Sequence, residues 1–191
     1  KISSVVVDRV KREMQQRIIT QINNHFDYEW FGLQNGRGNN WNPWICSNVI
    51  TVLLKYCSDP VVFKNCLGKL FIAGEMYLRN YSPDGACDEG PMYWGKSGGA
   101  FFEFLHQLYL STDGGMNLFD REIVKLMSEY ISFVNIGNNQ YVDFADGHAN
   151  VLHPAGVLYA MSEMTDNPEL AEEKLSDGGV TVLEHGDIAE M

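Results

Sequence analysis

The sequence contains no apolar run that approaches the about 20 residues a membrane-spanning helix needs. It also has few cysteines, and these form no CxxC pair and show no metal-type spacing; they are Cys46, Cys57, Cys66 and Cys87. Three of them fall within predicted helices or at their ends, which favours buried free thiols. A Cys57–Cys66 disulfide stays open as an alternative. We predict no membrane span, no metal site and no cofactor.

Basic residues are too few to balance the acidic ones, since 14 Lys and Arg stand against 25 Asp and Glu, for a net charge of -11. This mean field repels phosphate, so a nucleic-acid-binding or anionic-membrane surface is disfavoured. An acidic sugar is not excluded, because two or three cations in a cleft dominate the field within a Debye length, about 8 Å at physiological salt.

The chain has 191 residues and is 45% hydrophobic, which is enough for one core and too little for two domains. It opens on Lys1 rather than methionine, has no signal peptide and ends at Met191 with no obvious stop. We therefore expect a single domain, residues 1–191, that is a fragment of a longer protein.

Apolar residues recur at helical spacing between short Pro, Gly and Asp turns. Helices are expected over residues 4–24, 42–56, 60–80, 91–109, 120–134, 154–164 and 168–175, with caps at Ser3, Asp59 and Asp120. Residues 140–145 predict a short strand or an extended loop, and residues 180–183 a weak strand. Short connections between helices favour antiparallel pairs. The prediction is an all-α fold of stacked helical hairpins.

Residues 90–97 read GPMYWGKS and match the P-loop pattern G-x-x-x-x-G-K-[ST]. A P-loop follows a buried strand, whereas residues 81–89 are acidic and rich in turn residues. Pro91 donates no N–H, and Tyr93 and Trp94 would crowd a phosphate cradle. Nucleotide binding is therefore disfavoured.

The same stretch is better explained as the entry to a helix. Residues 83–85, Pro-Asp-Gly, predict a turn, and Asp88 and Glu89 then lie where carboxylates favour a helix dipole. Pro91 places Tyr93 and Trp94 in the first helical turn. Three following glycines, Gly95, Gly98 and Gly99, cost about 1 kcal/mol each against alanine, which predicts a close approach by another helix or by a ligand.

A second cluster precedes the helix at 42–56, where Arg37, Asn39, Asn40, Trp41, Asn42 and Trp44 lie within eight residues. Indole rings stack on the C–H faces of sugars, and amides match hydroxyl and carboxylate groups. Each residue alone is explained as a core anchor, turn or cap. Together they favour saccharide binding.

These stretches resemble the signatures of heparinase II/III-like and related alginate-lyase-type enzymes. The resemblance rests on NNWNPWIC at 39–46, PDGACDEGPMYW at 83–94 and YVDFADGH at 141–148, and it covers about residues 30–166. It implies an incomplete α/α toroid, here without the β-sandwich domain of the family. It also implies a periplasmic or secreted protein and an acidic polysaccharide or oligosaccharide as partner.

Enzymes of this family cleave uronate-containing polysaccharides by β-elimination, and the resemblance assigns proton transfer to Tyr93. A phenol suits an acid, and it needs nearby cations such as Lys96 or Arg37 to act as a base. The resemblance assigns the carboxylate-neutralising amide to Asn40, with Asn39 and Asn42 as competitors.

The family's histidine beside the amide is absent, and His148 is the best remaining candidate, while His153 and His25 are better explained as structural residues. The arrangement predicts substrate contacts for Arg37, Asn39, Trp41, Asn42, Trp44, Glu89, Trp94 and Lys96. Two alternatives stay open. One is a glycoside hydrolase that pairs Asp88 or Glu89 with Asp143 or Asp146. The other is a non-catalytic glycan-binding helical module.

Overall fold

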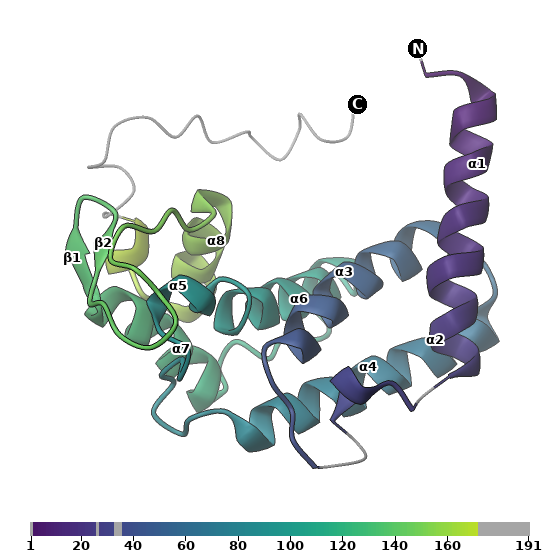
Figure 1. Ribbon diagram of the computed structural model, residues 1–191. Coiled ribbons are helices and arrows are strands. Elements are labelled where there is room, and N and C mark those ends of the chain that lie inside the picture. The colour runs from purple at the N-terminus through teal and green to yellow at the C-terminus, as the bar shows by residue number, and fades with distance from the viewer. Residues whose placement is uncertain (1, 26, 33–35, 172–191) are drawn as a thin grey trace.

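The computed structural model describes residues 2–25, 27–32 and 36–171 (Figure 1). Most of these residues are helical. The longer elements are α1 (Ser4–Met14), α3 (Trp41–Tyr56), α4 (Pro60–Asn80), α6 (Gly98–Ser111), α7 (Glu122–Phe133) and α8 (Ala155–Thr165). Shorter ones are η1 (Gln15–Ile19), α2 (Thr20–Asn24), η2 (Glu29–Phe31), α5 (Pro91–Trp94), β1 (Asn135–Gly137) and β2 (Gln140–Tyr141). The expectation of an all-α chain is confirmed, apart from one small hairpin.

The first helical segment runs as predicted to Asn24, with a π-helical turn, η1, between α1 and α2. Its apolar stripe is buried only in its second half, at Ile19 and Ile22. The first half has no buried residue, and α1 extends past the other helices (Figure 1). Ser3 occupies the N-cap position of α1, as predicted. Its side chain, however, makes no capping hydrogen bond.

Helix α3 is central to the core, because it packs against both α4 and α6. Its buried face, including Cys46, Ile50 and Leu53, carries the predicted helical spacing. The hairpin with α4 begins where the Asp-Pro signal predicts, since the Asp59 carboxylate accepts hydrogen bonds from Val61 N (2.8 Å) and Val62 N (3.2 Å).

The predicted helix 91–109 is divided into α5 and α6, with Ser97 in a non-helical conformation between them. The glycines explain the break. A Cβ on Gly98 would lie 2.8 Å from Trp94 Nε1, and one on Gly99 would lie 3.1 Å from the same indole ring. The close approach predicted at these glycines is therefore made by the chain's own Trp94, whose Nε1 donates to Met127 O (3.1 Å).

Helix α7 starts one residue later than expected, with Arg121 rather than Asp120 at its cap position. The Asp120 carboxylate instead lies 3.5 Å from Lys125 Nζ, so the prediction of Asp120 as the cap is wrong. After α7, Asn138 and Asn139 both have positive φ (55° and 57°) and form the two-residue turn of the antiparallel β1–β2 hairpin.

The expected strand at 140–145 is only two residues long, and residues 142–146 form an exposed loop. Helix α8 begins directly after Pro154, close to the predicted start, and residues 169–171 are helical as expected. The remainder of the predicted helix 168–175 and the predicted strand 180–183 lie outside the described residues.

The four cysteines are free, so Cys57 and Cys66 form no disulfide. Cys46 and Cys66 are buried as predicted, whereas Cys57 is only partly buried; Cys87 is buried as well. In the described part of the chain, no helix is both long and apolar enough to cross a bilayer.

Candidate functional site

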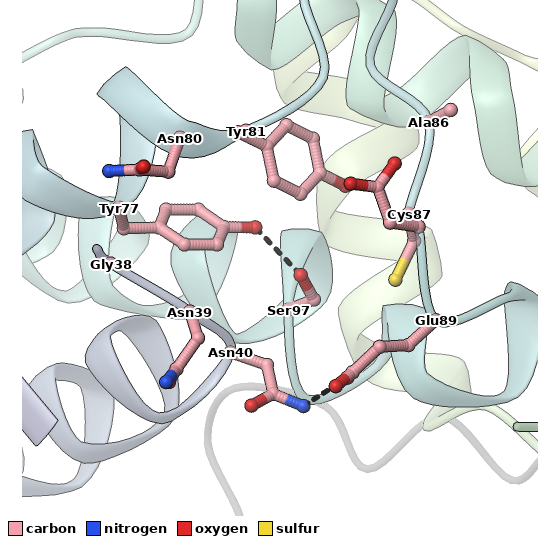
Figure 2. A pocket seen from close by; sticks show the side chains of 11 residues that line it. Gly38, Asn39, Asn40, Tyr77, Asn80, Tyr81, Ala86, Cys87, Glu89 and Ser97 are labelled. Carbon is pink, nitrogen blue, oxygen red and sulfur yellow. Dashed lines mark hydrogen bonds between the residues drawn. The ribbon is translucent and has the colours of Figure 1, made fainter.

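The two sequence clusters meet where the N-terminal ends of α3 and α5 face each other. Asn40 occupies the cap position of α3, and its Nδ2 donates a hydrogen bond to Glu89 Oε2 just before α5 (Figure 2). The two residues are 49 positions apart in the sequence. This bond joins the amide-rich segment to the Asp-Gly…Glu-Gly segment at one point.

The meeting point borders a pocket of about 230 Å³. Its walls are formed by Gly38, Asn39, Asn40, Tyr77, Asn80, Tyr81, Ala86, Cys87, Asp88, Glu89 and Ser97. Deep in it, the hydroxyl groups of Tyr77 and Ser97 are hydrogen-bonded at 2.9 Å (Figure 2). Burial raises the pKa of Tyr77, so its phenol is neutral at physiological pH. The pocket is smaller than the usual 300–1,000 Å³ of ligand sites.

The turn before α5 is held by its own polar groups, as the Pro-Asp-Gly sequence predicts. The Asp84 carboxylate accepts hydrogen bonds from Ser82 Oγ (2.7 Å) and Ala86 N (3.0 Å). These two hydrogen bonds lower the pKa of the Asp84 carboxyl group, and the bond from Ser82 has the larger effect. Gly85 has a positive φ of 80°, and its carbonyl accepts from Tyr81 Oη at 3.2 Å. The turn thereby directs Glu89 toward Asn40.

Carboxylates gather around Glu89. Burial, then the charges of Asp146 and Asp88, raise the pKa of the Glu89 carboxyl group. Glu89 therefore accepts a proton more readily than an exposed glutamate.

Removing that charge gives a pH-dependent prediction. The pKa of Glu89 is higher in the folded chain than the usual 4.5. At pH values above the folded pKa, the ionised carboxylate therefore lowers the free energy of unfolding. The cost disappears as pH falls below the unfolded value. We expect Glu89→Gln to raise the melting temperature near neutral pH and to match the wild type in acid, as measured by thermal denaturation across pH.

The control is Glu163→Gln at an exposed position of α8, which should leave the melting temperature unchanged both near neutral pH and in acid. A Glu89→Gln variant that melts lower than the wild type at neutral pH would contradict the account.

The loop 142–149 that follows β2 packs against the start of α5. Gly90 has φ +91°, and a Cβ there would lie 2.5 Å from Phe144 O, while a Cβ on Gly147 would lie 3.3 Å from the Met92 side chain. This loop carries Asp146 and the exposed His148. His148 is therefore on a segment that contacts the turn bearing Tyr93.

Gly90→Ala should destabilise the fold by about 1–3 kcal/mol, because alanine is strained at this φ and its methyl group collides with the loop. Urea unfolding measures the change. Gly68→Ala on α4, where an added Cβ meets nothing within 4 Å, is the matched control and should be neutral or stabilising. Equal losses from both substitutions would show that the loop contact is unimportant.

A second group is formed by Lys96, which follows α5, with the aromatic rings of Trp44 and Tyr93. Lys96 Nζ is 4.9 Å from the centroid of the Trp44 ring and 5.7 Å from that of Tyr93. Both rings are half-buried and Lys96 is exposed. The ammonium group of Lys96 therefore lies near the aromatic rings of both Trp44 and Tyr93, as expected of a cation beside Tyr93.

Two predicted substrate contacts are instead part of the core. Asn42 is fully buried, and its Nδ2 donates to Phe31 O (3.2 Å) and Ala73 O (3.1 Å). Trp94 is also fully buried against the glycines of α6. Their side chains face protein on all sides, which gives them a structural role instead of the predicted contact with substrate.

The other predicted contacts are at the surface. Asn39 lines the pocket, and its Oδ1 accepts from Trp41 N (2.9 Å). Trp41 is 51% exposed, and its ring centroid lies 5.4 Å from that of Trp44. Arg37 is exposed on the segment that leads to the pocket.

Sequence reasoning did not identify Tyr77, Tyr81, Asn80, Cys87 and Ser97 as pocket residues. Tyr77 and Cys87 are also buried, and Tyr77 follows the helical spacing of core residues, so nothing in their pattern separates them from the core. Only the fold brings the end of α4 beside the break at Ser97.

Neither a scan against models of protein families nor a search of curated proteins finds a match to this chain. Among the residues that the structure describes, no three His, Cys, Asp or Glu side chains gather as metal ligands would. The functional argument therefore depends on the geometry of the site.

Proposed function

We propose that the chain is the helical part, an incomplete α/α toroid, of a polysaccharide lyase that cleaves uronate-containing polysaccharides by β-elimination. The observation that carries the proposal is the Asn40–Glu89 hydrogen bond, because it unites the two motifs on which the resemblance to heparinase II/III-like enzymes rests. A longer protein would add the β-sandwich domain, and the resemblance favours a periplasmic or secreted location.

The reaction divides among three residues. Asn40 donates its second N–H to the uronate carboxylate and stabilises the negative charge that develops when the C5 proton leaves. A base takes that proton, and the electron pair of the C5–H bond forms the C4–C5 double bond. The C4–O4 bond breaks, and its electron pair leaves with O4. An acid then protonates O4 of the departing sugar.

We assign the acid role to Tyr93. The nearby Lys96 ammonium group is the reason to consider Tyr93 for the base role as well. His148 is the second proton-transfer candidate, because its loop contacts the start of α5. Glu89 orients Asn40 through their hydrogen bond.

A glycoside hydrolase is the second candidate, and the raised pKa of Glu89 favours it. A raised pKa suits a carboxyl group to the general-acid role, and Asp146 is the carboxylate whose charge acts most strongly on Glu89. We rank this function second because it gives no role to Tyr93, Lys96 or the amide of Asn40.

Product masses separate these functions. Alginate, heparan sulfate and hyaluronan would each be incubated with the full-length protein and the fragments analysed by mass spectrometry. Elimination gives fragments whose masses sum to that of the substrate, whereas hydrolysis adds one water for each cut. Binding without any cleavage would indicate a glycan-binding module and would contradict the proposed reaction.

A further inference from the structure

A second cavity, of about 440 Å³, lies beside α3 on the side where η1, α2 and η2 pack. Four aromatic side chains line it: Tyr28, Trp30, Trp41 and Trp44. We call it the aromatic groove. Its volume is within the about 300–1,000 Å³ of small-molecule sites.

We infer that the aromatic groove is a glycan subsite that binds a pyranose ring of the same polysaccharide, next to the sugar at the Asn40 pocket. The inference deepens the proposed function and depends on it. It adds Tyr28, Trp30 and the polar residues of the groove wall to the contacts expected from the sequence.

The arrangement of the rings supports this ligand. Tyr28 and Trp30 are stacked, with centroids 5.9 Å apart and planes inclined by 15°, and both rings are half-buried in the groove wall. Trp41 presents the most exposed of the four rings, at 51%. Flat, partly exposed aromatic faces complement the C–H face of a pyranose.

Polar side chains distinguish the groove from a purely apolar docking face. Gln21 and Asn48 supply amides and Arg17 a guanidinium group, and these match sugar hydroxyl groups. Arg17 is ion-paired with Glu13 at 2.8 Å, which offsets its charge. The groove therefore suits the hydroxyl groups and C–H face of a ring more than a uronate carboxylate.

Trp44 connects the groove to the proposed reaction site. One part of its indole lines the groove, while Lys96 lies over the ring and also over Tyr93. The backbone N–H of Trp44 donates a hydrogen bond to Asn40 O at 3.3 Å, so Trp44 follows the cap residue of α3 by one helical turn. A saccharide that extends from the Asn40 pocket past Tyr93 thus reaches Trp44 and the groove.

The test measures binding rather than turnover. Tetrasaccharides and dodecasaccharides of alginate and of heparan sulfate would be titrated by calorimetry into full-length protein carrying Tyr93→Phe, which keeps the ligand intact. Adding Trp41→Ala should weaken dodecasaccharide binding about tenfold, because it removes a ring on which a sugar stacks, and should change tetrasaccharide binding far less.

Asn48→Ala, at an exposed position of α3, is the second test variant and should weaken dodecasaccharide binding in the same direction. Phe133→Ala, which removes an exposed aromatic ring on α7, is the matched control and should leave both affinities unchanged.

Equal dodecasaccharide affinity with and without Trp41→Ala would overturn the inference, as would an absence of binding by any of these oligosaccharides. Cleavage by the unsubstituted protein is scored separately from product masses. If the protein cleaves by elimination but Trp41→Ala leaves dodecasaccharide affinity unchanged, only the subsite is refuted. If Trp41→Ala weakens binding but no elimination product forms, only the proposed reaction is refuted.

Discussion

Tyr93→Phe is expected to lower kcat for elimination by about 10²–10⁴-fold, the usual contribution of a positioned proton-transfer group. The substitution removes only the phenolic oxygen. The ring keeps its packing against the core and its place beside Lys96, so folding stability should change by less than about 0.5 kcal/mol. Initial rates of unsaturated product formation, with thermal denaturation of both proteins, measure these effects.

Tyr159→Phe on α8 is the matched control, because it removes a hydroxyl group from another partly exposed tyrosine. It should retain wild-type activity. Near wild-type activity in Tyr93→Phe would refute the assignment of Tyr93 and leave His148 as the proton-transfer candidate. A large loss of stability in Tyr93→Phe would instead indicate a structural role.

Asn40→Ala is expected to lower kcat/KM by about 10²–10³-fold, the cost of removing one oxyanion-type donor. The fold should persist, because the Asn40 side chain makes no capping hydrogen bond to α3. The loss should appear mainly in kcat, since the carboxylate gains charge during the reaction. Steady-state kinetics on the best cleaved polysaccharide measure it.

Asn39→Ala is the comparison variant, because Asn39 is the competing carboxylate contact at the adjacent pocket position. A larger loss from Asn39→Ala than from Asn40→Ala would move the carboxylate contact to Asn39. Asn42→Ala is unsuitable as an activity test, because its buried amide bonds Phe31 O and Ala73 O and its removal should cost about 1–3 kcal/mol of stability.

The helices could be predicted because their signals are local. Asp59-Pro60 fixes the start of α4 through bonds within three residues, and apolar spacing gives the buried faces of α3 and α4. The break at Ser97 could not be predicted, because it depends on the packing of Trp94 against Gly98, Gly99 and the Met127 carbonyl of α7. The sequence contains the glycines but not the neighbour that fills the space.

The site could be predicted only in part, for the same reason. Amide and aromatic clusters mark Asn40 and Tyr93, but spacing does not distinguish Asn40 from Asn42. Their burial separates them, since Asn42 faces the core and Asn40 faces Glu89. Likewise the Tyr28 and Trp30 surface becomes visible only when η2 packs beside α3.

The most direct test of the proposed function is the ultraviolet absorbance of alginate, heparan sulfate and hyaluronan during incubation with the full-length protein. Elimination leaves a C4–C5 double bond conjugated to the carboxylate, so absorbance should rise with at least one substrate and stay flat with Tyr93→Phe. Chain shortening without a rise in absorbance would contradict β-elimination and would favour hydrolysis through Glu89.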